Sequence, residues 1–167
     1  PVSRAGARPG DRIWITGELG GPAAALAAWS SGGQPAGRER KRFVHPVPRI
    51  AAGLWLAQNG ARAMIDISDG LVADLGHIAA ASGVAVALDA DAVPLLCGTS
   101  LAALSSGEEY ELAVALPPAF GDGDAAGLFR DHDLRLTRVG ECRDGSGVHV
   151  TLDGRPLETP SGFDHFR

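Results

Sequence analysis

The chain has 167 residues, of which 45% are hydrophobic and 21% are charged, and its formal net charge at pH 7 is -5. This length suits one globular domain with a sizeable core, and the composition excludes a disordered chain. The acidic balance argues against nucleic-acid binding, which needs a basic face. No apolar run reaches the length of a membrane span, so the sequence predicts no membrane partner.

The two cysteines, Cys97 and Cys142, lack the spacing of a metal site and are too few for a disulfide framework. This cysteine usage favours the cytoplasm. Residues 1–10 begin without an initiator methionine and resemble a linker remnant. We therefore expect the chain to be a piece of a longer protein, cut at a domain boundary.

Apolar residues that alternate predict strands, and apolar residues at helical spacing predict helices. In chain order the pattern predicts a strand at 12–16, a helix at 23–30, a solvated loop around 38–42, a helix at 50–59, a strand at 63–67, a helix at 71–81, a strand at 84–88, a short helix within 94–104, a strand at 109–116, a helix at 125–131, strands at 137–141 and 147–152, and a loose tail. Strands and helices mix without a strict βαβ order. This predicts an α+β fold, with a mixed β-sheet packed with helices.

Two carboxylates, Asp66 and Asp69, lie three residues apart where a predicted strand passes into a predicted helix. Backbone N–H groups at a helix N-terminus bind phosphate, and carboxylates together with phosphate oxygens bind Mg²⁺. The pair could therefore hold a Mg²⁺–phosphate group. The alternative is that Ser68 or Asp69 caps the helix while Asp66 is solvated, and the pattern taken alone favours the cap.

Three other segments have simpler interpretations. Asp74 and His77 lie three residues apart on the predicted helix, as expected for a solvated helical face. The glycine-rich residues 17–22 lack the spacing of known phosphate-binding loops and predict a strand-to-helix turn. The acidic residues within 105–112 predict a polar turn whose glutamates face solvent.

Together, these segments resemble the C-terminal half of thiamine-monophosphate kinases, a family within the superfamily of aminoimidazole ribonucleotide synthetase. The resemblance rests mainly on Asp-Ile-Ser-Asp-Gly-Leu at 66–71 and Ser-Gly-Glu-Glu-Tyr-Glu-Leu at 106–112. Residues 8–17, 45–49 and 162–166 are also similar to the family. The resemblance implies a fold like the C-terminal domain of aminoimidazole ribonucleotide synthetase. It implies that residues 11–167 are the C-terminal domain of a two-domain protein whose N-terminal domain is absent. It also implies that the intact protein transfers the γ-phosphoryl group of ATP to thiamine monophosphate and forms thiamine diphosphate.

The family's motifs imply roles for five residues. Asp66 and Asp69 would be Mg²⁺ ligands, with Asp69 also catalytic, and Ser68 would contact ATP. Glu108 would contact the substrate, and Pro160 stands where the family often has a substrate-binding Trp. The family's N-terminal half supplies further Mg²⁺ ligands and the dimer contacts, so we expect a homodimer when the protein is intact and an inactive isolated domain.

The chain departs from the family pattern at several positions. Ser106 replaces a Gly, Glu109 replaces an Asp, and the loop at 20–25 lacks the Asp and Ser of the family. Two alternatives therefore stay open. The chain could belong to a related synthetase with another substrate, or it could be a non-catalytic domain that binds a nucleotide or a partner protein.

Overall fold

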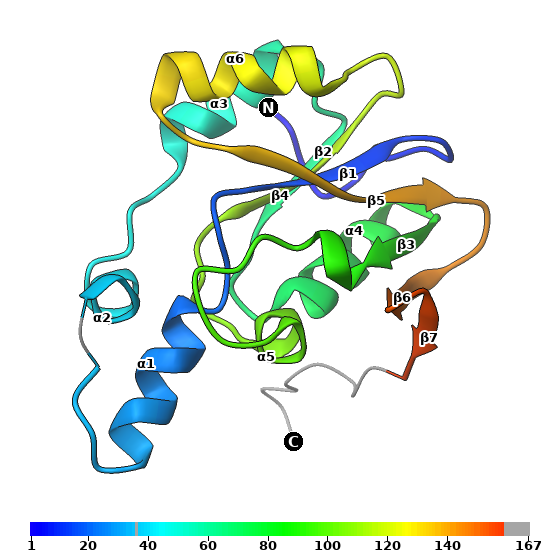
Figure 1. Ribbon diagram of the computed structural model, residues 1–167. Coiled ribbons are helices and arrows are strands. Elements are labelled where there is room, and N and C mark those ends of the chain that lie inside the picture. Colours follow the sequence, from blue (N-terminus) through cyan, green and yellow to red (C-terminus); the bar gives the residue numbers. More distant parts are fainter. Residues whose placement is uncertain (36, 159–167) are drawn as a thin grey trace.

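One mixed sheet runs through the domain, with helices against both of its faces (Figure 1). The computed structural model describes residues 1–35 and 37–158. In this part of the chain the strands are β1 (Arg12–Thr16), β2 (Ala63–Asp66), β3 (Ala85–Asp89), β4 (Leu112–Leu116), β5 (Leu136–Arg143), β6 (Gly147–Leu152) and β7 (Arg155–Leu157). The helices are α1 (Gly21–Ser30), α2 (Gly37–Val44), α3 (Ile50–Gln58), α4 (Leu71–Ser82), α5 (Ser100–Ser105) and α6 (Asp122–His132), with a short 3₁₀ turn at Ala90–Ala92.

The strand order in the sheet is β2-β4-β1-β5-β3-β6-β7. Strands β3 and β6 pair in parallel, and the other pairs are antiparallel. The α+β fold with a mixed sheet is therefore confirmed. Because β2 and β4 are neighbours, the ends of two segments far apart in the sequence come together at Asp66 and Leu112, which are register partners.

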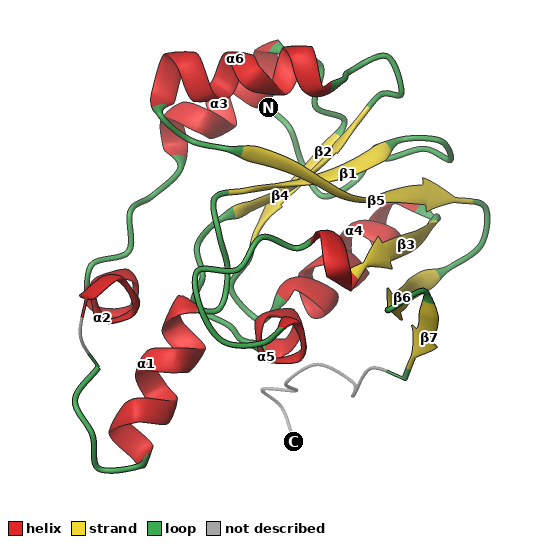
Figure 2. Ribbon diagram, viewed as in Figure 1, coloured by secondary structure: helices red, strands yellow, loops and turns green. Residues whose placement is uncertain are grey.

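Strand β4 is buried on both faces, and its two faces belong to different parts of the core. Ala113 and Ala115 pack in the cluster that includes the apolar face of α4. Val114 and Leu116 pack with Trp14 and with the buried residues of α3 and α6. Figure 2 shows the corresponding layers, with α3 and α6 on one side of the sheet and α4 and α5 on the other. Among the described residues, no helix is both long and apolar enough to cross a bilayer.

The basic run at 38–42 forms part of helix α2, so the prediction of a solvated loop is wrong. Two tertiary contacts explain the helix. Phe43 packs edge-on against Trp29 of α1 with ring centroids 5.2 Å apart. Arg38 and Arg42, one helical turn apart, both reach Glu18, the first at its carboxylate and the second at its backbone carbonyl. A single-sequence pattern contains neither partner, and it therefore missed the helix.

The start of one predicted strand and the predicted loose tail also need correction. The strand expected from residue 109 begins at Leu112, because Glu108 and Tyr110 have φ angles of 62° and 52°, which an extended strand cannot accommodate. The tail expected to be loose contains β7, which pairs with β6 through residues 155–157. Residues 159–167, including Pro160, lie outside the described part of the chain.

The N-terminal residues pack against the domain near β2. The amide of Met64 donates to the carbonyl of Ser3 at 2.9 Å, and Ala7 is buried in the core cluster that contains α4. Ser82 at the end of α4 accepts hydrogen bonds from the amides of Gly6 and Ala7 through its hydroxyl. These contacts bring residues 2–5 to the edge of the cavity described below.

Candidate functional site

The acidic turn connects β2 to α4 and carries three of the residues predicted for the site. Asp66 ends β2 with an exposed side chain, Ile67 is fully buried, and Ser68 and Asp69 are half-buried. Gly70 precedes the helix with a φ of 112°, and a Cβ there would lie 3.0 Å from the backbone of Ser105. The turn therefore needs glycine both for its backbone angle and for its close contact with another segment.

Asp74, in the first turn of α4, holds the acidic turn in place. Its side chain is 1% exposed, and its Oδ2 accepts hydrogen bonds from the amides of Ser68 at 2.9 Å and Asp69 at 3.0 Å. Burial raises the pKa of Asp74, while these two amides oppose the rise and the charge of Asp69 adds to it. The expected cap by Ser68 or Asp69 is wrong: neither side chain caps α4, and Asp74 bonds the turn from inside the helix.

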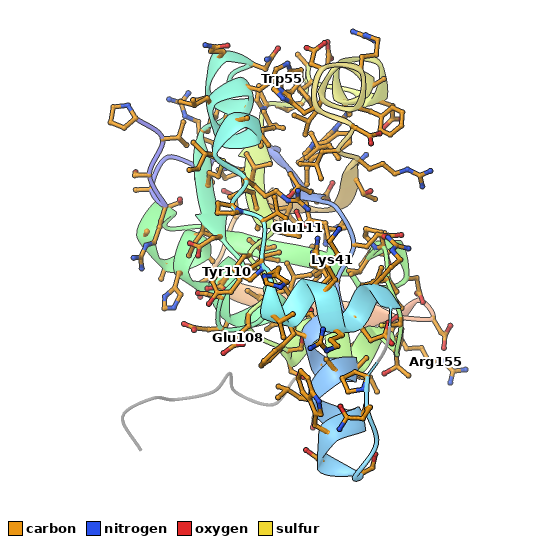
Figure 3. All side chains as sticks on the ribbon, turned by 90° about the vertical axis from the view of Figure 1, so that its left-hand side faces the viewer. Lys41, Trp55, Glu108, Tyr110, Glu111 and Arg155 are labelled. Carbon is orange, nitrogen blue, oxygen red and sulfur yellow. The ribbon has the colours of Figure 1, made fainter. Side chains whose placement is uncertain are left out.

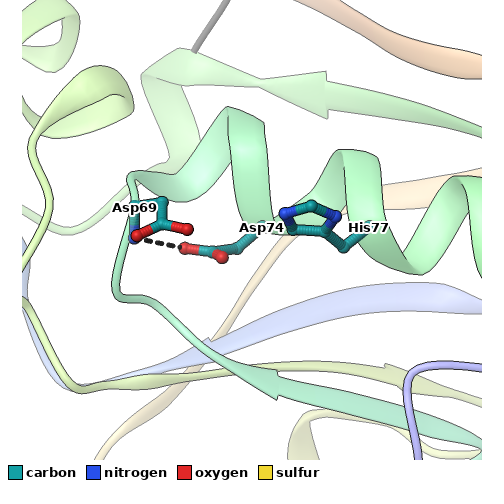
Figure 4. A group of neighbouring side chains, drawn as sticks. All are labelled: Asp69, Asp74 and His77. Atoms are coloured by element: carbon teal, nitrogen blue, oxygen red, sulfur yellow. Dashed lines mark hydrogen bonds between the residues drawn. The ribbon is translucent and has the colours of Figure 1, made fainter. Parts of the chain in front are cut away.

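Asp69, Asp74 and His77 offer ligand atoms that all lie within 4.8 Å of one another (Figure 4). They line a cavity of about 570 Å³ together with Asp66 and Ser68. Asp66 is not a member of the close group, although it faces the same cavity. Oxygen donors predominate in this lining, and such a donor set fits Mg²⁺ shared with phosphate oxygens. The prediction that Asp74 faces solvent is wrong, whereas His77 is exposed as expected.

The segment at 105–111 lies directly against the acidic turn. The amide of Glu108 donates to the carbonyl of Ser68 at 2.9 Å, and the amide of Tyr110 donates to the carbonyl of Ile67 at 2.9 Å. The amide of Ile67 in turn donates to the carbonyl of Glu111 at 2.8 Å. The two segments predicted to carry the site, about forty residues apart in sequence, are thus joined through their backbones.

The side chain of Glu108 projects from the two joined segments into solvent. Its side chain is exposed, its φ is 62°, and it lies on the face of the domain that Figure 3 presents. Gly107 makes the arrangement possible, because a Cβ there would collide with the carbonyl oxygen of Ser68. Glu108 is therefore fixed at its backbone while its carboxylate remains available to a ligand.

Glu109 and Glu111 point inward, so the expectation that the glutamates of this turn face solvent holds only for Glu108. Glu111 is fully buried and accepts hydrogen bonds from Arg49 Nε at 2.9 Å, from Arg49 Nη2 at 2.7 Å and from Thr16 Oγ1 at 2.6 Å. It also forms an ion pair with Arg42, whose Nη2 lies 2.6 Å from its Oε1. A carboxylate with two guanidinium partners can be buried because its charge is compensated. Sequence alone did not pair Glu111 with arginines 62 and 69 positions away.

Glu109 ties the segment at 105–111 to the glycine-rich loop before α1. Its Oε1 accepts from the amide of Gly20 at 2.6 Å and from the hydroxyl of Ser106 at 2.7 Å. Burial raises the pKa of Glu109, the bonds from Ser106 and Gly20 and the charge of Arg42 oppose the rise, and the charge of Glu111 adds to it. Glu109 therefore links two loops from within the domain, a role that its sequence context did not indicate.

The fold and these joined motifs define a domain related to aminoimidazole ribonucleotide synthetase. A family model described as AIR synthase related protein, C-terminal domain, matches residues 8–153. The chain belongs to this family.

Several curated relatives of the chain are thiamine-monophosphate kinases. The enzyme of Salmonella typhimurium is 36% identical over 181 aligned residues, which cover 99% of this chain and 55% of that protein. The enzyme of Methanopyrus kandleri is 35% identical over 93% of this chain and 51% of its own length. The chain thus spans about half the length of the curated relatives it matches.

Solved structures agree with these relatives. A thiamine-monophosphate kinase from Stenotrophomonas maltophilia superposes with a TM-score of 0.83 at 40% identity and covers 93% of this chain and 54% of that chain. AaThiL complexed with AMPPCP and TMP has a TM-score of 0.79 at 30% identity, covering 99% of this chain and 54% of its own. The hydrogenase maturation protein HypE of E. coli, at 22% identity and a TM-score of 0.71, shares the fold.

Proposed function

We propose that this chain is the C-terminal half of a thiamine-monophosphate kinase, which transfers the γ-phosphoryl group of ATP to thiamine monophosphate and forms thiamine diphosphate. The observation that carries the proposal is the backbone junction between the acidic turn and the segment of Glu108. This junction brings the residues implied for metal, nucleotide and substrate to one region. Similarity over 99% of the chain to a thiamine-monophosphate kinase supports the same assignment.

In this proposal Asp66 and Asp69 hold Mg²⁺, and Ser68 contacts the nucleotide. The bound metal would neutralise phosphate charge, which is the main requirement for phosphoryl transfer. Asp69 is the residue on which catalysis depends most, because Asp74 fixes its backbone while its carboxylate faces the cavity. Asp74 acts as a positioning residue, since its Oδ2 is committed to the two amides of the turn.

Glu108, which lies on the other of the two joined segments, contacts the substrate. Its strained backbone and its bond to the carbonyl of Ser68 fix the separation between the substrate and the metal-binding carboxylates. Such positioning of two reactants contributes a large share of the rate in a two-substrate reaction. Pro160, which also stands at a substrate position of the family, belongs to the same proposal.

The remaining parts of the active protein lie in its other half. We place further Mg²⁺ ligands and the dimer contacts in an N-terminal domain that precedes residues 11–167 in the intact protein. ATP and thiamine monophosphate bind between the two domains, and the isolated chain is inactive. The intact enzyme is a cytoplasmic homodimer in this account.

The roles are tested in the intact protein with Asp69→Asn and the matched control Asp144→Asn, which removes one carboxylate from an exposed turn far from the site in sequence. We expect Asp69→Asn to lower kcat by about 100-fold or more, with little change in unfolding free energy. Asp144→Asn should leave kcat unchanged. Near-normal turnover of Asp69→Asn would remove the metal assignment, whereas a folded wild-type protein without kinase activity would favour a related synthetase or a binding domain.

A further inference from the structure

A hollow of about 420 Å³ between α2 and the start of β5 is lined by four arginines. Arg38 and Arg42 come from α2, Arg49 from the residue before α3, and Arg135 from the residue before β5. We call this the arginine hollow. It shares no lining residue with the cavity of the acidic turn. The guanidinium groups therefore converge from three parts of the chain on a second, separate concavity.

The arginine hollow is positively charged in a protein that carries a net charge of -5. Its lining includes two carboxylates, Glu18 and Asp133, against the four guanidinium groups. Two positive charges are therefore in excess, and one remains in excess when the buried Glu111 beneath Arg42 and Arg49 is counted. A local excess of positive charge in a concave site attracts anions.

Two of the arginines are held rigidly and still border the hollow. Arg49 uses Nε and Nη2 to bind Glu111, and Arg42 uses Nη2 for both Glu111 and the carbonyl of Glu18. Each guanidinium has five N–H donors, so both retain donors beyond these bonds. Their side chains are 22% and 18% exposed for Arg42 and Arg49, respectively. The buried carboxylate thus orients two guanidinium groups toward the hollow without exhausting them.

The other two arginines do not contact the buried carboxylate of Glu111. Arg38 is 71% exposed and pairs with the carboxylate of Glu18 at the rim. Within residues 1–35 and 37–158, the side chain of Arg135 makes no hydrogen bond and no ion pair. Stabilisation of Glu111 explains Arg42 and Arg49, but it does not explain why Arg38 and Arg135 face the same hollow.

We propose that the arginine hollow binds the phosphate group of a small phosphorylated ligand directly, through guanidinium groups and without a metal ion. Guanidinium groups from several directions suit a tetrahedral dianion, whereas a planar carboxylate is matched by one arginine in a bidentate pair. The acidic turn needs a cation to hold phosphate, so the two sites differ in chemistry. Arg38 and Arg42 of the basic run at 38–42, to which the proposed kinase reaction assigns no role, acquire a ligand-binding role here.

The test titrates the chain with sodium phosphate and with sodium pyrophosphate at constant ionic strength, followed by NMR of the arginine side-chain Nε–H signals. Constant ionic strength removes the general screening of surface charge. We expect saturable shifts, and we expect Arg135→Gln to weaken phosphate binding about tenfold, because a charge-assisted hydrogen bond is lost. Arg38→Gln should weaken it by a smaller factor.

Arg155→Gln is the matched control, because it removes the same charge from the exposed strand β7 (Figure 3). Phosphate binding should be unchanged in this variant. Shifts that do not saturate, or an equal loss in Arg155→Gln, would show general ionic attraction and overturn the proposal. Sodium acetate that binds as tightly as phosphate would also contradict it. None of these results depends on kinase activity, so this proposal and the proposed function can fail separately.

Discussion

Replacement of Gly107 by alanine should disrupt the junction between the acidic turn and the segment of Glu108. The added Cβ would collide with the carbonyl oxygen of Ser68 and would lie 3.4 Å from its carbonyl carbon and 3.6 Å from the Cα of Asp69. These are backbone atoms and cannot rotate away. Forcing a methyl group into a packed contact costs about 1–3 kcal/mol, and loss of the hydrogen bond from Glu108 to Ser68 adds about 1 kcal/mol. We therefore expect a loss of about 2–4 kcal/mol in unfolding free energy.

The assay is urea denaturation followed by tryptophan fluorescence, since Trp14 is buried in the core. Gly76→Ala is the matched control, because a Cβ at this position of α4 meets nothing within 4 Å. The unfolding free energy of this control should rise by about 0.5–1 kcal/mol, because alanine is favoured over glycine inside a helix. If Gly107→Ala were as stable as the wild type, the two segments would not be in the close contact described here.

Three further predictions concern buried groups. Glu111→Ala should lower the unfolding free energy, measured by urea denaturation, by about 3 kcal/mol because it leaves two arginines without their carboxylate. Glu141→Ala, which removes a carboxylate from exposed ion pairs, should change the unfolding free energy by less than about 1 kcal/mol. Burial raises the pKa of Glu109 above the ordinary 4.5, so the folded state binds a proton at this carboxyl more tightly than the unfolded state does. The unfolding free energy should therefore fall as pH rises from 4.5 through the folded pKa. Glu109→Gln should show a shallower fall over that range, and an unchanged slope would contradict the shift. Burial raises the pKa of the Cys142 thiol to about 12, so this thiol should resist alkylation in the folded chain. The half-buried Cys97 should react first, and both cysteines should react once urea unfolds the chain.

Much of the fold was predictable, because local periodicity and the core agree. The strand at 12–16 is confirmed residue for residue as β1, and the strand at 147–152 as β6. The helix expected at 71–81 extends one residue further, to Ser82. In these segments the large apolar residues lie in the core or pack against it. The α+β class followed from the same elements.

The errors occur where a distant partner decides the local structure. Helix α2 has no buried residue of its own and depends on Trp29 and Glu18. The inward direction of Glu111 depends on arginines that the sequence places far away. A charged residue in a single sequence is predicted to face solvent unless its partner is known. For this reason the burial of Asp74, Glu109 and Glu111 was not predicted.

In the candidate site, too, local sequence indicated residue types, whereas distant partners determined where the side chains lie. The family resemblance singled out Asp69 and Glu108 as candidate site residues, but it gave no indication that backbone hydrogen bonds join their two segments. The sequence pattern also misplaced Asp74, whose carboxylate is buried and shapes the acidic turn. Residue types thus suggested the chemistry that we propose, whereas the positions of the groups depend on the pairing of β2 with β4.

The most direct test of the central claim is formation of thiamine diphosphate from thiamine monophosphate and ATP by the intact protein. The reaction is measured with Mg²⁺ and again with excess EDTA. The account predicts turnover with Mg²⁺ that EDTA abolishes. A folded protein that forms no thiamine diphosphate under either condition would contradict it.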